Sequence, residues 1–364
     1  MNTFTSLSPR TQAFVVKDLL ERGFPYLVFE KFGMSKPIPS RSTKTMQFRR
    51  YFLDGSAFTN GYSPYEYYEG NSGANELFDI TTTAATGQDG GRKLSEGITP
   101  EPVDLTFEDI DVTLEQFGMY TEITDQVQDF HEDPILQEAI DTLGESGAFL
   151  AENVRYNALK GGTNVYYGLT GTTEARNQVD APISLPLQRL ITRGLKRNLA
   201  KPITKVVKSS AAYGTEAISP AFVGICHPDL EADIRSMDGF VPAEKYGSMS
   251  PFEGEIGKVE SVRYIVSTVV TSLGDVGNST IPSTVMGTTA VTVYPILYFA
   301  QNAYAVVPLK GKNAITPMVL NPGVARGGDP LGQRGSVGIK FYHACLILQD
   351  FWMARAEVAA SKLG

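Results

Sequence analysis

Residues 133–160 form one long amphipathic segment, and it limits the folds open to this chain. The segment begins at Asp133-Pro134, an N-cap residue followed by proline at the first helical position, and it stops before Gly161-Gly162. Its apolar stripe has spacings of three and four and consists of Leu136, Ile140, Leu143, Gly147, Leu150 and Val154. At 1.5 Å per residue the predicted helix is about 40 Å long. A helix of this length with one narrow stripe must lie along a sheet or a partner. A coiled coil would also fit, although too few heptads are present to favour it.

Two alternating segments before this helix predict a long β-hairpin. Residues 34–44 contain two prolines and no periodicity, which is typical of an extended arm. The first strand is expected over 45–53, with one side formed by Met46, Phe48, Arg50 and Phe52. The second strand is expected over 103–117, and the slip in its alternation between Phe107 and Ile110 indicates a bulge.

Residues 54–100 separate the two strands and contain eight glycines and a cluster of tyrosines. Loops of this length are usually functional or mobile. We interpret the segment as an elaborated tip of the hairpin.

The rest of the chain predicts two further helices and several strands. The helices are expected over 187–199 and directly after His227-Pro228. The strands are expected over 221–226, 258–268, 288–300, 302–309, 336–348 and 351–360. Helices dominate the middle of the chain and strands dominate the parts before and after it, so the predicted class is α+β.

The charges are segregated along the chain, whose overall net charge is -8. Residues 1–50 hold nine Lys or Arg and three Asp or Glu, whereas residues 101–160 hold fifteen acids and two cations. Such opposite segments could attract each other within one chain or between copies, or could be two independently solvated faces. The candidate residues for contacts between subunits are Arg41, Lys44, Arg49, Arg50, Asp109, Asp111, Glu115, Glu138 and Asp141.

No catalytic or cofactor-binding motif emerges from the sequence, so we expect no enzyme activity, no cofactor and no metal. His131, His227 and His343 lie in different segments, as expected for helix caps or for a structural histidine in a strand. The carboxylates on 109–115 follow the polar side of a strand, which favours a solvated or arm-facing edge over a glycosidase pair. Two cysteines in no metal-binding spacing and the absence of a long apolar run favour a cytosolic, soluble protein without a membrane partner.

Several short strings, in a shared order, resemble the major capsid protein of tailed bacteriophages with the Hong Kong 97-like fold, and more narrowly the coat proteins of N-four-type podophages. The strings cover most of the chain: KTMQFRRY (44–51), EGITP (96–100), DVTLEQFGMYTEITD (111–125), HEDPILQEAIDTLGE (131–145), NVRYNAL (153–159), AKPIT (200–204), CHPDLEADIRS (226–236) and GEIGKVESVRYIVS (254–267). The tip at 54–100 is longer and richer in tyrosine than we expect of that family.

The resemblance implies a division into named parts. These are an N-arm (1–33), an E-loop (34–118) with its long tip (54–100), a P-domain (119–182 and 331–364) with a spine helix at about 133–160, and an A-domain (183–330).

The resemblance also implies a function. The chain would self-assemble through hexamers and pentamers into an icosahedral shell around double-stranded DNA, within a virion built in the bacterial cytoplasm. Its partners would be other copies of itself, scaffolding and portal proteins, a decoration protein, and DNA bound without sequence specificity. The alternatives are a carboxylate-based hydrolase and an encapsulin-like bacterial shell compartment.

Overall fold

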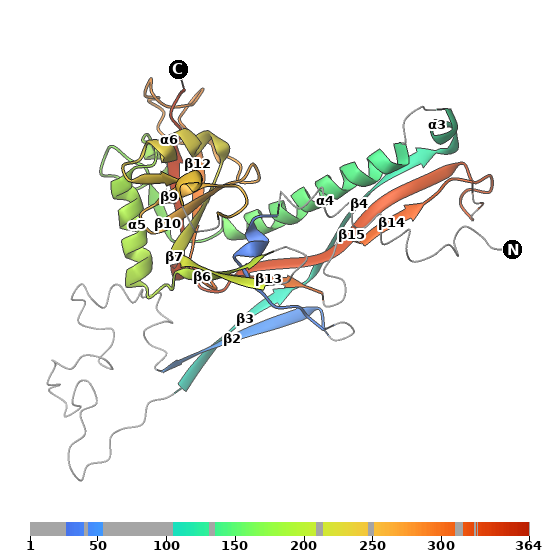
Figure 1. Ribbon diagram of the computed structural model, residues 1–364, viewed down its shortest axis with the longest axis horizontal. Coiled ribbons are helices and arrows are strands. Elements are labelled where there is room, and N and C mark those ends of the chain that lie inside the picture. The colour runs from blue at the N-terminus through green and yellow to red at the C-terminus, as the bar shows by residue number, and fades with distance from the viewer. Residues whose placement is uncertain are drawn as a thin grey trace, which may run out of the picture.

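The computed structural model describes residues 27–39, 43–53, 105–130, 135–208, 214–246, 251–309, 316–323, 325 and 327–363. These residues form a compact domain, a long strut that projects from it, and a two-stranded hairpin that leaves their junction in a different direction (Figure 1). Helices and strands are mixed throughout, so the expected α+β class is confirmed.

The strut consists of helix α4 (Ile135–Leu159), strand β4 (Glu115–Thr124), strand β15 (Arg334–Ile347) and strand β14 (Thr316–Leu320). Strand β15 is central, pairing with β4 on one side and β14 on the other. The helix lies along this sheet, which confirms the predicted long helix and places it against a sheet (Figure 1). The predicted cap at Asp133-Pro134 lies outside the described residues. Helix α3 (Asp125–Phe130) follows β4 at the far end of the strut.

The buried face of α4 follows the predicted stripe over its first half only. Ile140, Leu143 and Gly147 are buried as expected. Leu150 and Val154 are half-buried, and further along the helix the buried positions are Ala148, Ala151, Glu152, Arg155, Tyr156 and Leu159. The face changes because the helix leaves the strut sheet and ends inside the core of the compact domain, to which Tyr156 and Leu159 contribute.

The hairpin consists of strands β2 (Thr45–Leu53) and β3 (Leu105–Thr113). Their register is unbroken along both strands, so the predicted bulge between Phe107 and Ile110 is wrong. The return segment instead bends at the buried Leu114, whose N–H donates to the carbonyl of Lys44 at 2.9 Å, and continues as β4 in another sheet. The predicted tip at 54–100 lies outside the described residues.

The compact domain is built on a nine-stranded sheet with the main strand order β5-β16-β12-β7-β10-β9-β8. Strand β11 also pairs with β12, and β6 also pairs with β7. The strands are β5 (Val165–Tyr167), β6 (Ile203–Lys208), β7 (Gly214–Cys226), β8 (Phe240–Pro242), β9 (Glu255–Val259), β10 (Val262–Val266), β11 (Gly274–Asp275), β12 (Thr292–Phe299) and β16 (Met353–Ala359).

Both faces of this sheet are covered. Helices α5 (Leu185–Arg197) and α6 (Glu231–Ser236) pack on one face, through residues such as Ile191 and Ile234. The end of α4 and the 3-10 helix η3 (Phe29–Lys31) pack on the other. The remaining short 3-10 helices are η6 (Arg176–Gln178), η7 (Pro228–Leu230), η8 (Ala243–Lys245) and η9 (Asp350–Trp352).

The segment predicted as one strand over 258–268 is two strands, β9 and β10. They join in a tight turn at Glu260-Ser261, where Glu260 has a φ of 51°. The sequence misleads here because apolar residues continue directly on both sides of a turn that contains neither glycine nor proline.

The two sheets cut across the predicted division into P-domain and A-domain. Strands β14 and β13 (Tyr304–Pro308) fall within 183–330 but belong to the strut's sheet, which β1 (Met34–Ser35) also joins. Strand β16 falls within 331–364 but lies inside the nine-stranded sheet. The chain crosses repeatedly between strut and compact domain, and the division by sequence range stays a prediction.

Candidate functional site: the strut, the hairpin and their junction

The structure pairs two of the predicted inter-subunit residues with each other inside one chain. Arg49 on β2 lies opposite Asp109 on β3, and its guanidinium binds both carboxylate oxygens at 2.7 and 2.8 Å. Arg49 also lies over the ring of the exposed Phe107, 4.4 Å from its centroid. The hydrogen bonds from Arg49 lower the pKa of Asp109. Each of these charges therefore already has a partner within the hairpin.

For the other charged residues predicted in or beside the hairpin, the structure shows no such ion pair among the described side chains. Lys44 is exposed just before β2, and Asp111 is exposed opposite Gln47. Arg50 lies opposite Glu108 in the β2–β3 register, while Arg41 lies outside the described residues.

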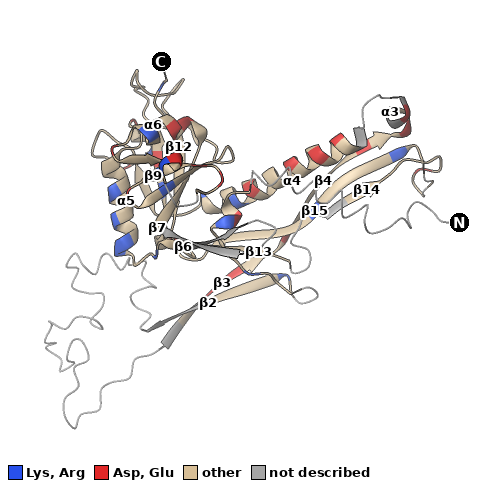
Figure 2. Ribbon diagram, in the orientation of Figure 1, with Lys and Arg blue, Asp and Glu red and all other residues tan. Residues whose placement is uncertain are grey.

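The predicted acidic residues beyond the hairpin lie on the strut. Glu115 is exposed at the start of β4, opposite His343 of β15. On α4, Glu138 is exposed and Asp141 is half-buried. Acidic positions recur along α4, and the hairpin extends away from that helix (Figure 2). The described hairpin and α4 of one chain are therefore not positioned to pair their charges, and the inter-subunit role of these residues stays a prediction.

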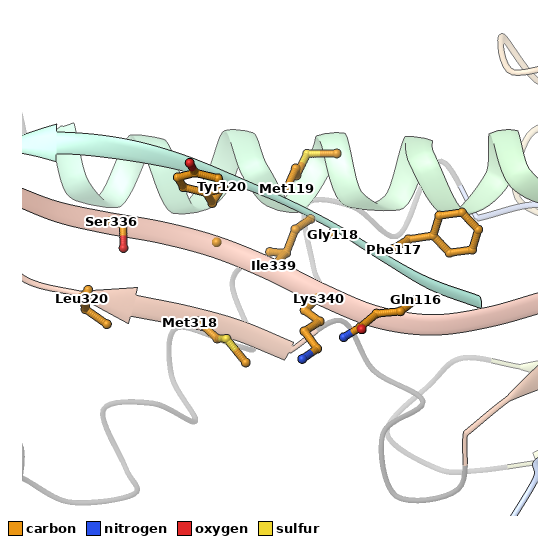
Figure 3. Close-up of a pocket in the computed structure, with 11 residues that line it drawn as sticks. Gln116, Phe117, Gly118, Met119, Tyr120, Met318, Leu320, Ser336, Ile339 and Lys340 are labelled. Atoms are coloured by element: carbon orange, nitrogen blue, oxygen red, sulfur yellow. The ribbon is translucent and has the colours of Figure 1, made fainter. Parts of the chain in front are cut away.

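The strut sheet has an open face, which we define as the face of β4, β14 and β15 turned away from α4. Alternation places Val337, Ile339 and Phe341 in the core under α4. A shallow hollow of about 520 Å³ opens on this face and has these lining residues: Gln116, Phe117, Gly118, Met119, Tyr120, Met318, Leu320, Ser336, Gly338, Ile339 and Lys340. Figure 3 shows Met318 and Leu320 of β14 beside Ser336 and Lys340 of β15.

Two glycines form the floor of this hollow. A Cβ at Gly118 would lie 2.7 Å from the carbonyl oxygen of Ile339, and one at Gly338 would lie 3.0 Å from the Cβ of Tyr120. Tyr120 is 71% exposed and Met318 is 52% exposed. The hollow thus combines exposed apolar side chains with the polar Gln116, Ser336 and Lys340, and it is a surface that another protein could cover.

The junction between strut and compact domain contains an ionic cluster that our sequence analysis missed, in which Glu152, Arg155 and His343 are buried and Glu30 is exposed. We call Glu30, Glu152, Arg155 and His343 the junction cluster. Arg155 pairs with Glu152, binds Glu30 at 2.9 Å, and donates its Nε–H to His343 Nε2 at 3.1 Å. Glu152 also accepts the backbone N–H of Phe29 at 3.0 Å. The cluster thereby ties three distant parts of the chain together.

The environment of the junction cluster determines its protonation. Burial and the neighbouring Arg155 lower the pKa of His343 to about 3, so this histidine is neutral at physiological pH. Burial also raises the pKa of Glu152, while Arg155 and the Phe29 N–H act against that shift. The sequence signal was available: Glu152 and Arg155 interrupt an otherwise apolar helix face at a spacing of three.

A second buried ionic group fixes the end of α4. Glu357 on β16 is fully buried and accepts hydrogen bonds from Arg176 at 2.6 and 2.7 Å and from Arg355 at 2.9 Å. Arg355 also donates to the carbonyls of Lys160 and Gly162, just past the helix. A cation at a helix C-terminus stabilises the helix dipole. This contact joins the strut helix to the central sheet.

The histidines that the structure describes have structural roles. His343 is a buried structural histidine and His227 caps η7 by accepting the N–H of Asp229, both as predicted. His131 lies outside the described residues. Within the described ranges there is no group of three or more His, Cys, Asp or Glu that could hold a metal ion. None of the described helices has the length and apolar character needed to cross a membrane.

Comparisons with known proteins agree with this architecture. The chain is 23% identical to the major capsid protein of Pseudomonas phage KPP21 over 267 residues, which is 68% of this chain and 66% of that protein, just under two thirds of its length.

Solved structures of a phage capsid and of an encapsulin have a similar fold. The capsid of Ralstonia phage GP4 matches 93% of this chain and 92% of its own, with 14% identity and a TM-score of 0.62. The holo-SrpI encapsulin complex of Synechococcus elongatus PCC 7942 matches 100% of this chain and 92% of its own, with 12% identity and a lower TM-score of 0.50.

A family model described as phage capsid protein matches residues 107–354, well over half of the chain. This match, together with the higher TM-score of the phage GP4 capsid, favours a phage capsid protein over the encapsulin alternative, which shares the fold. The expectations of a tailed-phage major capsid protein and of the Hong Kong 97-like fold are confirmed, and proteins of this kind are virion components that assemble into a shell. The chain belongs to the phage capsid protein family.

Proposed function

We propose that this chain self-assembles through hexamers and pentamers into an icosahedral shell that encloses the double-stranded DNA of a tailed phage. The observation that carries the proposal is the shape of the subunit: a strut and a hairpin project from one compact domain in different directions (Figure 1). Such projections leave much surface for contacts with several copies. The open face of the strut, with its exposed apolar residues, is one such surface.

The proposal also includes the domain ranges, the partner proteins and the place of assembly. The N-arm, E-loop, P-domain and A-domain would occupy the ranges expected from the sequence. The strand pairing supports one change, in which β13 and β14 would join the P-domain and β16 the A-domain. The subunit would act with scaffolding, portal and decoration proteins, bind DNA without specificity, and catalyse no reaction. Assembly would take place in the host cytoplasm.

The first experiment is to express the chain alone and to examine it by negative-stain electron microscopy and sedimentation velocity. Closed shells, tubes or rings that sediment far above the 39.6 kDa monomer would support the proposal. A monodisperse monomer or dimer that is unchanged by added salt, crowding agent or co-expressed scaffold would contradict it.

The role of the hairpin charges can be tested separately because Arg49 and Asp109 bind each other. Reversing both, as Arg49→Glu with Asp109→Arg, keeps an ion pair in the hairpin and exchanges its poles. Impaired assembly of this folded variant would support an inter-subunit contact. Normal shells would mean that the pair acts only within the hairpin.

A further inference from the structure

Helix α5 presents a basic outer face on an acidic protein. Residues 185–201 contain five Lys or Arg and no Asp or Glu, although the whole chain has a net charge of -8. Figure 2 shows the cationic positions of α5 along its length. The inner face, with Ile191 and Leu195, packs in the core, while Arg193 and Lys196 are exposed.

The two exposed cations at the centre of this face have no counter-ion within the described part of the chain. Arg189, one turn earlier, binds Glu260 at 2.6 Å, whereas no described acid lies within ion-pair distance of Arg193 or Lys196. Beside the start of the helix, Leu190 is 40% exposed and borders a hollow of about 390 Å³ lined by Pro182 and Pro186. Apolar surface next to unpaired charge is typical of the edge of a protein interface.

A complementary acidic surface lies elsewhere on the same domain. Residues 228–244, which include α6, contain five acids and one cation, and the exposed Lys245 follows them. Asp238 and Glu244 are exposed, whereas Asp233 is buried, Glu231 pairs with Arg235, and Asp229 accepts a hydrogen bond from Tyr294. Helices α5 and α6 both cover the same face of the nine-stranded sheet but lie at different edges of that layer (Figure 1). The two charged surfaces are therefore separate patches of one side of the domain.

We propose that the basic face of α5 binds the acidic surface at residues 228–244 of a second copy of this chain. A contact between two different patches is heterologous, and repeating it by rotation generates a ring. Charge complementarity selects the partner and the register, while the apolar surface around Leu190 contributes contact area. The inference rests on the proposed self-assembly and names a surface through which it would occur.

Charge-reversal variants test this contact. Arg193→Glu with Lys196→Glu, and separately Asp238→Lys with Glu244→Lys, should each lower the assembled fraction in sedimentation velocity about tenfold or more, because like charges would then face each other. All four substitutions in one chain should restore assembly. The matched control, Arg193→Lys with Lys196→Arg, should assemble as the wild type does, and circular dichroism should show that every variant is folded.

The outcomes separate this inference from the proposed function. A wild type that does not assemble counts against the proposed function and against this inference with it. If the wild type assembles and the variant with Arg193→Glu and Lys196→Glu also assembles, the contact alone is overturned. The contact is also overturned if the variant with all four substitutions assembles no better than the two double variants. Normal assembly with lost retention of double-stranded DNA would overturn it too, since the basic face would then bind a polyanion.

Discussion

The compact domain and the strut are each built on a β-sheet, but the two sheets differ in how many of their faces are covered. The nine-stranded sheet is covered on one face by α5 and α6 and on the other by η3 and the end of α4, so its central strands are almost entirely buried. The strut sheet has α4 on one face, while its other face leaves Tyr120, Met318 and Leu320 exposed. A sheet packed on both sides is complete within one chain. A sheet packed on one side has surface that another molecule can cover.

The junction shows how a thin strut is held to a compact domain. The junction cluster ties α4 and β15 to the segment at Phe29, and Arg355 ties the end of α4 to β16. Buried charges are costly unless they are paired and hydrogen-bonded. These groups meet that condition through contacts between segments far apart in the sequence, so we expect the junction to unfold together with the compact domain.

Truncating one aromatic side chain in each region, buried in the compact domain and exposed on the strut, should give the largest contrast in stability. Phe222→Ala, at a position 1% exposed in the compact domain, should lower the free energy of unfolding by about 3–5 kcal/mol because it leaves a cavity. Tyr120→Ala, at a position 71% exposed on the strut, should change it by less than about 0.5 kcal/mol. Urea denaturation of the unassembled proteins measures both values. Equal losses would contradict the contrast between a closed and an open sheet.

Removing the cation of the junction cluster tests whether the junction belongs to the cooperative core. Arg155→Ala leaves the fully buried carboxylate of Glu152 without its ion-pair partner and should destabilise the protein by about 3 kcal/mol. The control is Arg235→Ala, which removes an exposed pair with Glu231 within α6 and should cost less than about 1 kcal/mol. Similar urea midpoints for the two variants would mean that the cluster does not hold the junction.

Acidification should weaken the junction through His343. Its pKa is about 3 in the folded protein and about 6.5 in an unfolded chain, so the unfolded state binds a proton first as the pH falls. The contribution of His343 to stability is complete only well above pH 6.5, and by pH 5 it should have fallen by about 2 kcal/mol from that value.

The comparison with His343→Gln isolates this contribution from the other groups of the cluster. Arg155 contacts the imidazole, and Glu152, Glu30 and Cys345 interact with Arg155 in turn. The raised pKa of Glu152 acts in the opposite sense at low pH. Urea unfolding at several pH values should give a shallower pH dependence for the variant than for the wild type. Identical slopes would show that His343 does not titrate on unfolding.

The smallest effect is expected in the hairpin. Arg49→Ala should leave the unfolding midpoint close to that of the wild type, because the pair with Asp109 is exposed to solvent. The pKa of Asp109 should rise toward its ordinary value once the hydrogen bonds from Arg49 are lost, as an NMR titration would measure. Lys44→Ala is the control, and it should leave the pKa of Asp109 unchanged. A large loss of stability would mean that the hairpin is integral to the core.

The sequence by itself determined the elements that have strong local signals. The periodicity of 133–160 predicted α4, the alternation at 45–53 placed Met46 and Phe48 toward the core, and the apolar spacing after 187 predicted α5. Side-chain period and turn residues are local properties, so a single chain displays them. The resemblance of its short strings to phage capsid proteins identified the family before the architecture was known.

Only the tertiary structure decided which segments meet. It separated β3 from β4 at Leu114, divided 258–268 into two strands, and put the neighbouring strands β15 and β16 into different sheets. It also paired Arg49 with Asp109 in the hairpin and Arg155 with Glu152 and His343 at the junction. Such pairings depend on long-range register and on the cost of burying unpaired charge, and neither is a property of a local stretch of sequence.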